Sequence, residues 1–247
     1  MKKLLKGFII IFLLSVSIVL SAQMESFPCN SSNPQLKSLF KGGVIKSLNI
    51  HGCYGPGLGN LSSTFLMPTG KAPKIIESET EGEPPNDDAY VNWTCTYSPG
   101  KISDNDPKTA WVEGVKGTGI GEVLIVPCLD LAKPVKIWAG YGKSQTVFTS
   151  NSRPKKIRTV IIRAELGGGA QYGTDYENLK VISEGVVILG DKNGYQNLSI
   201  PKFKVDTFFS QISNSYVKYE YLLGIEILEV YPGTKYEDTC ISEIVNE

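Results

Sequence analysis

Short apolar segments alternate with turn residues from about residue 91 to the end of the chain. Val, Ile, Tyr and Phe dominate these segments, which have the length of β-strands, and none sustains the period of an amphipathic helix. Gly, Pro, Asn and Asp separate them, so the pattern predicts an all-β protein built as a β-sandwich or barrel. The segments span 122–127, 135–140, 155–166, 185–190, 198–209 and 221–231.

Two of these segments carry finer information. In 155–166 both faces mix apolar and polar side chains, which predicts a strand that is buried for part of its length. In 221–231 the alternation slips by one residue where Leu228 directly follows Ile227. A slip of this kind predicts a β-bulge or burial on both faces.

The first 22 residues have a different pattern. Three lysines precede an apolar run from Phe8 to about Leu20, and small residues follow it. This order is typical of a secretory signal peptide with cleavage near Ala22, and the run is too short to favour a retained membrane anchor. We therefore expect a protein that is secreted, periplasmic or on the cell surface, with no stable membrane span after cleavage.

The rest of the chain divides at about residue 72. Residues 23–72 are rich in Ser, Gly, Asn and Pro and are expected to form an irregular N-terminal segment, and 78–90 reads as an exposed acidic loop. Residues 73–247 would form the β-domain. Without the three lysines of the signal peptide, 22 basic side chains face 25 acidic ones, a net charge of about −3. This balance gives no basic field for a nucleic-acid partner.

Five cysteines remain in the exported chain, and sequence alone does not fix how they pair. An odd number leaves at least one cysteine unpaired or joined to another chain. One functional alternative is therefore a surface component that assembles with other proteins through residues 24–72 and an unpaired cysteine. The cysteines are Cys29, Cys53, Cys95, Cys128 and Cys240.

The stretch "SDNDPKTAW" at 103–111 gathers oxygen-bearing side chains in a short loop. Calcium takes six to eight oxygen ligands from carboxylates, hydroxyls, amides and backbone carbonyls, and loops of this composition supply them. The loop is not an EF-hand, because Lys108 stands at its fifth position and no glycine follows. A plain Asp/Asn/Pro turn is the alternative, and the residues alone leave both open.

Glu113 and Glu122 flank a glycine-rich turn. A pair of carboxylates is what glycoside hydrolysis requires, so a hydrolase is one alternative function. Glutamates in such positions are more often partners of a buried Arg or Lys, and Arg153 and Lys156 are available. The structural role is the favoured one.

Aromatic side chains offer flat surfaces on which sugar rings can stack. Trp111 is expected in the core, whereas Trp93 and Tyr141 lie beside polar or glycine residues and are expected to be more exposed. The candidate ligand-binding residues are Trp93, Tyr141, Arg153, Glu113 and Glu122.

Three blocks together resemble a known family. They are "YSPGKISDNDPKTAWVEGVKGTGIGEVLIV" at 97–126, "GYGKSQTVFTSNSRPKKIRTVII" at 140–162 and "EVYPGTKYEDTCISEI" at 229–244. The combination is similar to the discoidin-type domain named for the translocation region of secreted NAD glycohydrolases, a galactose-binding-like β-sandwich related to factor V/VIII type C modules. The resemblance runs from roughly residue 75 to the end, and it departs at Ala139, where an asparagine often stands.

This resemblance implies a non-catalytic module that binds a glycan or another cell-surface ligand. It also implies a structural calcium ion held between the Asp-rich loop and a glutamate near the C-terminal strand, and a plain turn stays the alternative. Matched residue by residue, the calcium ligands would be Asp104, Asp106, Thr109 and Glu243. An enzyme, either the hydrolase or an NAD glycohydrolase, is the competing class.

Overall fold

The computed structural model describes residues 32–53, 57–76, 87–170 and 173–247. The signal-peptide prediction, Cys29 and most of the acidic loop at 78–90 lie outside these residues. Within them no helix is long and apolar enough to cross a membrane. The elements are α1 (Leu36–Leu39), β1 (Ile45–His51), β2 (Leu61–Ser62), α2 (Asp88–Thr94), a 3-10 helix (Pro99–Ser103), β3 (Trp111–Val112), β4 (Val123–Val126), β5 (Val135–Trp138), α3 (Gln145–Ser150), β6 (Arg153–Ala170), β7 (Gly173–Ile188), β8 (Gln196–Leu198), β9 (Thr207–Ser210), β10 (Ser215–Lys218), β11 (Glu220–Tyr231), β12 (Cys240–Ile241) and β13 (Glu243–Asn246).

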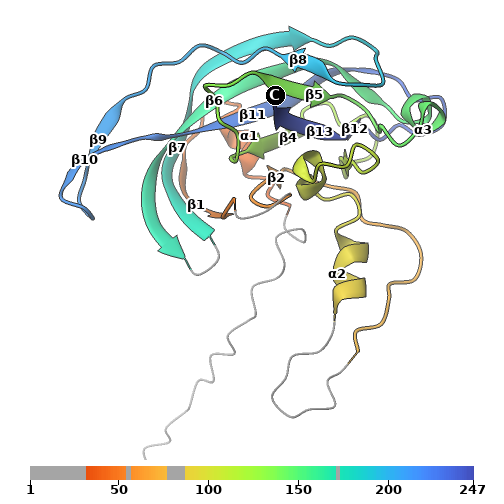
Figure 1. The fold of residues 1–247 in the computed structure, drawn as a ribbon, viewed down its shortest axis with the longest axis horizontal. Coiled ribbons are helices and arrows are strands. Elements are labelled where there is room, and N and C mark those ends of the chain that lie inside the picture. The colour runs from red at the N-terminus through yellow and green to blue at the C-terminus, as the bar shows by residue number, and fades with distance from the viewer. Residues whose placement is uncertain (1–31, 54–56, 77–86, 171–172) are drawn as a thin grey trace, which may run out of the picture.

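The strands form a sandwich of two antiparallel layers, so the all-β prediction is confirmed (Figure 1). The large sheet has six strands in the order β1-β7-β6-β11-β4-β2, and the smaller one has three in the order β13-β5-β8. β3 pairs with β12, and β9 pairs with β10 in a hairpin that projects at the left of Figure 1. The helix α3 lies at the opposite end.

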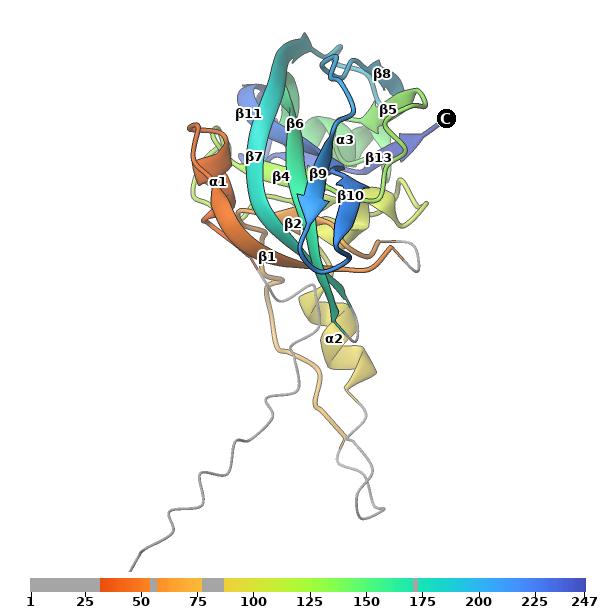
Figure 2. The same ribbon diagram turned by 90° about the vertical axis from the view of Figure 1, so that its left-hand side faces the viewer.

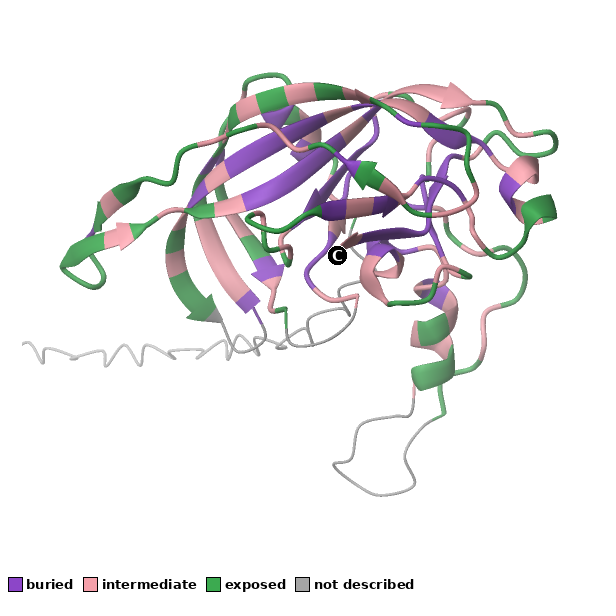
Figure 3. Cartoon of the chain, turned by 45° about the horizontal axis from the view of Figure 1, so that its top comes forward, coloured by how far each residue is buried: buried purple, intermediate pink, exposed green. Residues whose placement is uncertain are grey.

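The main core fills the space between the two sheets (Figure 3). Trp111 is fully buried in it, as the sequence predicted, and its indole N–H donates to the Thr64 carbonyl at 3.0 Å. Isoleucines and leucines of β4, β6 and β11 face aliphatic residues of β5, β8 and β13. Burying such side chains provides most of the stabilisation of a sandwich, at about 25 cal/mol per Å² of apolar surface.

The predicted features of the two long strands are present. In β6 the residues 159–162 are buried on both faces, because a second core lies on the far side of the large sheet. In β11 the pairing with β6 shifts register around Glu229, which confirms the bulge. Because of this bulge, apolar residues before and after the register shift, such as Ile227 and Val230, both pack against the main core.

The N-terminal segment is more regular than expected. β1 extends the large sheet by pairing with β7, and β2 pairs with β4 at the opposite edge. The helix α1 covers the outer face of the sheet, with Leu36 and Leu39 in the second core (Figure 2). The described part of residues 23–72 is thus a structural component of the sandwich, with Ile45 and Ile50 of β1 buried in the second core.

Three short helices interrupt the strands, and their lengths of four, seven and six residues are too short to show a helical period. The helix α3 begins where the Ser144 hydroxyl accepts a hydrogen bond from the Val147 amide at 3.1 Å. The helix α2 includes residues 88–90, at the end of the predicted acidic loop, and hangs below the sandwich in Figure 1.

The cysteines staple the N-terminal part of the chain to the sandwich. Cys53 forms a disulfide with Cys128, and Cys95 is also disulfide-bonded. Cys240 is free, but it is fully buried, and burial raises the pKa of its thiol. A covalent contact with another chain through Cys240 would require the domain to open.

Candidate cation site and its surroundings

The Asp-rich loop is organised by its own side chains. The Thr109 hydroxyl lies 2.9 and 3.0 Å from the two carboxylate oxygens of Asp104, and the Asp106 amide donates to Asp104 Oδ1 at 3.1 Å. The Lys108 amide donates to Asp106 Oδ1 at 3.0 Å. Asn105 has a φ of 63°, in the left-handed region that asparagine tolerates well. Loop carboxylates are thereby held together despite their like charge.

The C-terminal strands bring a distant glutamate to this loop. β12 pairs with β3, directly after the loop, and β13 pairs with β5. Between them, the Ser242 hydroxyl donates to the Pro107 carbonyl at 3.0 Å, a contact between residues 135 positions apart. Ser242 also accepts the Gly142 amide at 2.9 Å. These contacts fix the position of Glu243 beside Asp104 and Asp106.

Glu243 is fully buried, and no well-formed hydrogen bond reaches either of its carboxylate oxygens in the described structure, although the Asp106 amide and the Asp104 carboxylate lie close by. Burial raises the pKa of Glu243 to about 7; the negative charges of Asp104 and Asp106 add to this shift, and the Asp106 amide opposes it. A buried carboxylate without a partner is costly, and like charges beside it add to the cost. The electrostatics at this point therefore favour a positive charge.

One ammonium group is already close. Lys101 Nζ lies 3.3 Å from Asp104 Oδ2, and both side chains are partly exposed. This ion pair neutralises one side of Asp104 and leaves Glu243 unpaired. In the described residues no three His, Cys, Asp or Glu side chains are arranged as a ready metal centre. A cation here would have to draw on the Thr109 hydroxyl and backbone carbonyls as well, and an all-oxygen set of this kind suits calcium.

Glu122 is also buried, but it is fully partnered. Lys37 Nζ forms an ion pair with its Oε1, and the hydroxyls of Ser63 and Thr64 both donate to Oε2 at 2.6 Å. Burial raises the pKa of Glu122, but the bonds from Lys37, Ser63 and Thr64 outweigh it, so the pKa is lowered. The carboxylate is anchored to the N-terminal segment and has no access to solvent.

Glu113 lies in the same turn with weaker partners. Its Oε2 accepts the Val115 amide at 2.8 Å and its Oε1 accepts the Thr239 amide at 3.4 Å. Burial, opposed by these two bonds and assisted by the charges of Asp238 and Glu122, raises the pKa of Glu113 to about 7. Neither glutamate pairs with Arg153 or Lys156. Both have the structural role that the sequence predicted, but they bind other groups.

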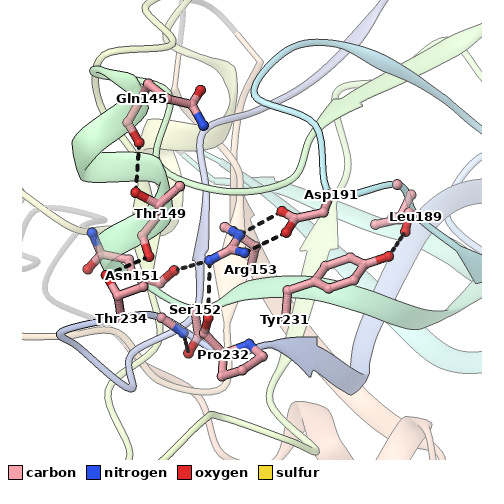
Figure 4. A network of polar contacts seen from close by, with 12 residues as sticks. Gln145, Thr149, Asn151, Ser152, Arg153, Leu189, Asp191, Tyr231, Pro232 and Thr234 are labelled. Atoms are coloured by element: carbon pink, nitrogen blue, oxygen red, sulfur yellow. Dashed lines mark hydrogen bonds and ion pairs between the residues drawn. The ribbon is translucent and has the colours of Figure 1, made fainter.

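Arg153 is the centre of a separate polar network (Figure 4). Its Nε and Nη2 bind the two oxygens of Asp191 at 2.9 and 2.7 Å, and its Nη1 donates to the carbonyls of Asn151 and Pro232. The guanidinium also stacks near Phe148, 5.0 Å from the ring centroid. All three nitrogens of the Arg153 guanidinium thus bind groups inside the protein. These bonds join α3, β6 and β11 to the loop after β7.

Residues 86–247 match the protein family described as NAD glycohydrolase translocation F5/8 type C domain. The chain belongs to this family. The matched residues include the Asp-rich loop, the glycine-rich turn and the C-terminal strands, and the match confirms the resemblance seen in the sequence. A translocation F5/8 type C domain suggests a non-catalytic translocation or binding module. The match begins after β1 and β2, which nevertheless complete the large sheet.

Solved structures give only distant likenesses. An arabinofuranosyltransferase from mycobacteria is 12% identical, with a TM-score of 0.33, and the aligned region covers 82% of this chain and 11% of the transferase. A GH29 fucosidase of Ruminococcus gnavus in complex with fucose is 11% identical, with a TM-score of 0.30, covering 86% of this chain and 28% of the fucosidase. The comparison with curated proteins finds no match.

The predicted aromatic residues of this F5/8 type C domain are only half-exposed. Trp93 lies on α2, with its ring 6.4 Å from that of Tyr90. Tyr141 packs against the small cluster of Ala110, Val112 and Cys240, and burial raises the pKa of its hydroxyl to about 12. The two rings lie on different elements, and neither is brought to Arg153, Glu113 or Glu122 by a contact in the described structure.

Several partner residues were not foreseen. Lys37, Ser63 and Thr64 come from the segment expected to be irregular, and they hold Glu122 through contacts 58 to 85 residues apart. No local motif marks them, because each is an ordinary polar residue until the fold brings it to the glutamate. Asp191 is similarly unmarked, although its neighbour Gly190 signals a turn.

Proposed function

We propose that this protein is an exported recognition module that binds a glycan or cell-surface ligand through loops at one end of its sandwich. We further propose that a structural calcium ion, held by Asp104, Asp106, Thr109 and Glu243, fastens the Asp-rich loop to the C-terminal strands. The observation that carries the calcium assignment is the buried Glu243 carboxylate, which no well-formed hydrogen bond reaches and which faces two aspartates. Export is supported by the signal-like N-terminus, and binding by the family.

The residues around Glu243 suit this role. Asp104 and Thr109 are oriented by each other, and Asp106 is fixed by the Lys108 amide, so the loop is ordered before a cation arrives. Ser242 joins the loop to the strand that carries Glu243. A bound calcium ion would supply positive charge to three carboxylates at once. The effect is structural, since a cation bound only to the folded chain stabilises it.

The same features argue for binding rather than catalysis. Glu113 and Glu122, the pair considered for hydrolysis, are buried and bound within the domain. A hydrolytic pair must reach a substrate on both sides of its scissile bond. A non-catalytic role is therefore the one that the arrangement supports.

A glycan array probed with the purified protein in calcium-containing buffer tests the proposal. We expect saturable binding to at least one class of saccharide, confirmed by retardation in affinity gels that contain it. The matched sample, denatured and refolded in chelator, should bind less. Absence of binding to every saccharide on the array, with a folded protein, would overturn the glycan assignment.

A further inference from the structure

A second candidate surface lies where the end of β5 meets the loop 190–195, which precedes β8. The rings of Trp138 and Tyr195 meet edge to face, with centroids 5.0 Å apart and an interplanar angle of 75°. Tyr195 is 37% exposed, so a large part of its ring faces solvent. An exposed aromatic surface beside polar groups is the usual composition of a sugar-binding platform.

The indole of Trp138 is fixed on two sides. Its Nε1–H donates to Asn193 Oδ1 at 3.0 Å, and the backbone of Gly142 lies so close that an added Cβ would stand 2.8 Å from the ring. Trp138 also pairs with Glu243 across β5 and β13. The aromatic pair therefore sits on the same strands that hold the candidate cation site.

The loop 190–195 is held at three points. The Gln196 side chain closes it, accepting the Gly190 amide at 2.8 Å and donating to the Gly190 carbonyl at 3.0 Å. Asp191 is bound by Arg153 through both oxygens. Asn193 Nδ2 donates to Gln145 Oε1 of α3 at 3.2 Å. A loop fixed in this way loses little conformational entropy when a ligand binds.

The polar groups at this surface can bond to the hydroxyls of a sugar, and the exposed Lys192 of the same loop adds an ammonium group. Figure 4 shows Asp191 and Gln145 on either side of Arg153. The Asp191 side chain is 40% exposed, so its oxygens can accept further hydrogen bonds while Arg153 balances its charge. Gln145 is exposed and offers an amide. Because the Arg153 guanidinium already binds Asp191 and two backbone carbonyls, it is not directed at an anionic ligand.

We propose that Tyr195, Trp138, Asn193, Gln145 and Asp191 form a binding surface for a neutral saccharide. A sugar ring packs on the Tyr195 face, and its hydroxyls bond to Asp191 and to the Gln145 amide. The assignment rests on the proposed recognition function and locates it at one surface. It differs from the ligand residues expected from the sequence, of which Arg153, Glu113 and Glu122 are buried.

Two variants test the surface, with one matched control. Tyr195→Ala removes the exposed ring, and Gln145→Ala removes an exposed amide at the first residue of α3. Tyr216→Ala makes the same aromatic truncation at a site on β10 that is 76% exposed and belongs to the distant hairpin. All three are compared with the unmodified protein on the glycan array and by titration with the saccharide that binds, after thermal melts establish folding.

We expect Tyr195→Ala to weaken binding at least about tenfold, since aromatic anchors dominate such contacts. Gln145→Ala should weaken it about threefold, and Tyr216→Ala should leave it unchanged. If the unmodified protein binds a saccharide and both Tyr195→Ala and Gln145→Ala bind it equally well, this surface is not the site, while the recognition function stands. If the unmodified protein binds none, the recognition function itself fails. Should Tyr195→Ala unfold, Gln145→Ala decides alone.

Discussion

Glu122 and Glu243 are both buried glutamates on the same sandwich, and their surroundings are opposite. Glu122 receives an ammonium group and two hydroxyls, and its pKa is lowered. No well-formed hydrogen bond reaches Glu243, which faces two aspartates, and its pKa is raised to about 7. Burial is therefore not what separates them; the charge of the neighbouring groups is. One carboxylate is satisfied by the protein, and the other has the surroundings of a cation ligand.

The comparison also separates two halves of the chain. The partners of Glu122 come from residues before the family match, whereas the neighbours of Glu243 all lie within it. The N-terminal segment thus stabilises the glycine-rich turn, and the C-terminal strands serve the Asp-rich loop. Variants at each glutamate should consequently respond to different treatments.

Removing the cation partner of Glu122 should have the largest effect. Lys37→Met keeps most of the side-chain volume but leaves a buried carboxylate with two hydroxyls only. Breaking a buried pair by removing one partner costs about 3–5 kcal/mol, and the partial exposure of Lys37 favours the lower end. Urea unfolding monitored by tryptophan fluorescence measures the loss.

Two further variants control that measurement. Lys41→Met changes an exposed lysine of the same segment and should leave the free energy of unfolding within about 0.5 kcal/mol of that of the unmodified protein. Adding Glu122→Gln to Lys37→Met removes the buried charge and should recover part of the loss. If Lys37→Met is as stable as Lys41→Met, the ion pair does not hold the turn.

Calcium should have the next largest effect, and it should act through Glu243. At a calcium concentration of 100 times its dissociation constant, a single site adds about 2.7 kcal/mol to stability, so the melting midpoint should rise relative to a chelator. Glu243→Gln should abolish this rise, and without calcium it should melt at or above the unmodified protein, since a buried charge is gone. Differential scanning calorimetry gives both values.

The control for this experiment is Glu237→Gln, which alters an exposed acid close to the same strand. It should keep the full calcium response. A melting midpoint that calcium does not move in the unmodified protein would refute the cation site, and a response that survives in Glu243→Gln would place the ion elsewhere.

The fold was largely readable from the sequence because strand faces follow a period of two residues. That period located β4, β5, β6 and β11, and its slip located the bulge near Glu229. The helix α1 and the strand β2 were missed because four and two residues carry too little pattern, and the seven residues of β1 because their apolar positions do not alternate regularly in a Gly- and Ser-rich segment.

The sites were less readable, for a different reason. Side chains from opposite ends of the chain meet at Glu122 and at Glu243, and no local spacing encodes such meetings. Glu243 was placed beside the Asp-rich loop only through the family resemblance. Lys37 lies outside that resemblance, so nothing in the sequence pointed to its ion pair with Glu122. Arg153 was predicted to bind a ligand, but it forms an ion pair with Asp191.

Glu113 offers the smallest and most discriminating test, because it lies between the two extremes. Its pKa is raised to about 7 in the folded protein, so the folded state binds a proton more tightly than the unfolded state does. Stability from this group is therefore present below its unfolded pKa of about 4.5 and is lost as pH rises towards 7. Glu113→Gln cannot ionise and should flatten this part of the pH profile.

Chemical unfolding at intervals between pH 4.5 and 8, in a chelator so that calcium does not contribute, measures the profile. Glu165→Gln, at a more exposed position on β6, is the matched control and should keep the slope of the unmodified protein. An equal slope in Glu113→Gln would mean that the two backbone amides from Val115 and Thr239 hold the carboxylate ionised throughout. In that case Glu113 would behave like Glu122, and an uncompensated buried charge would be confined to Glu243.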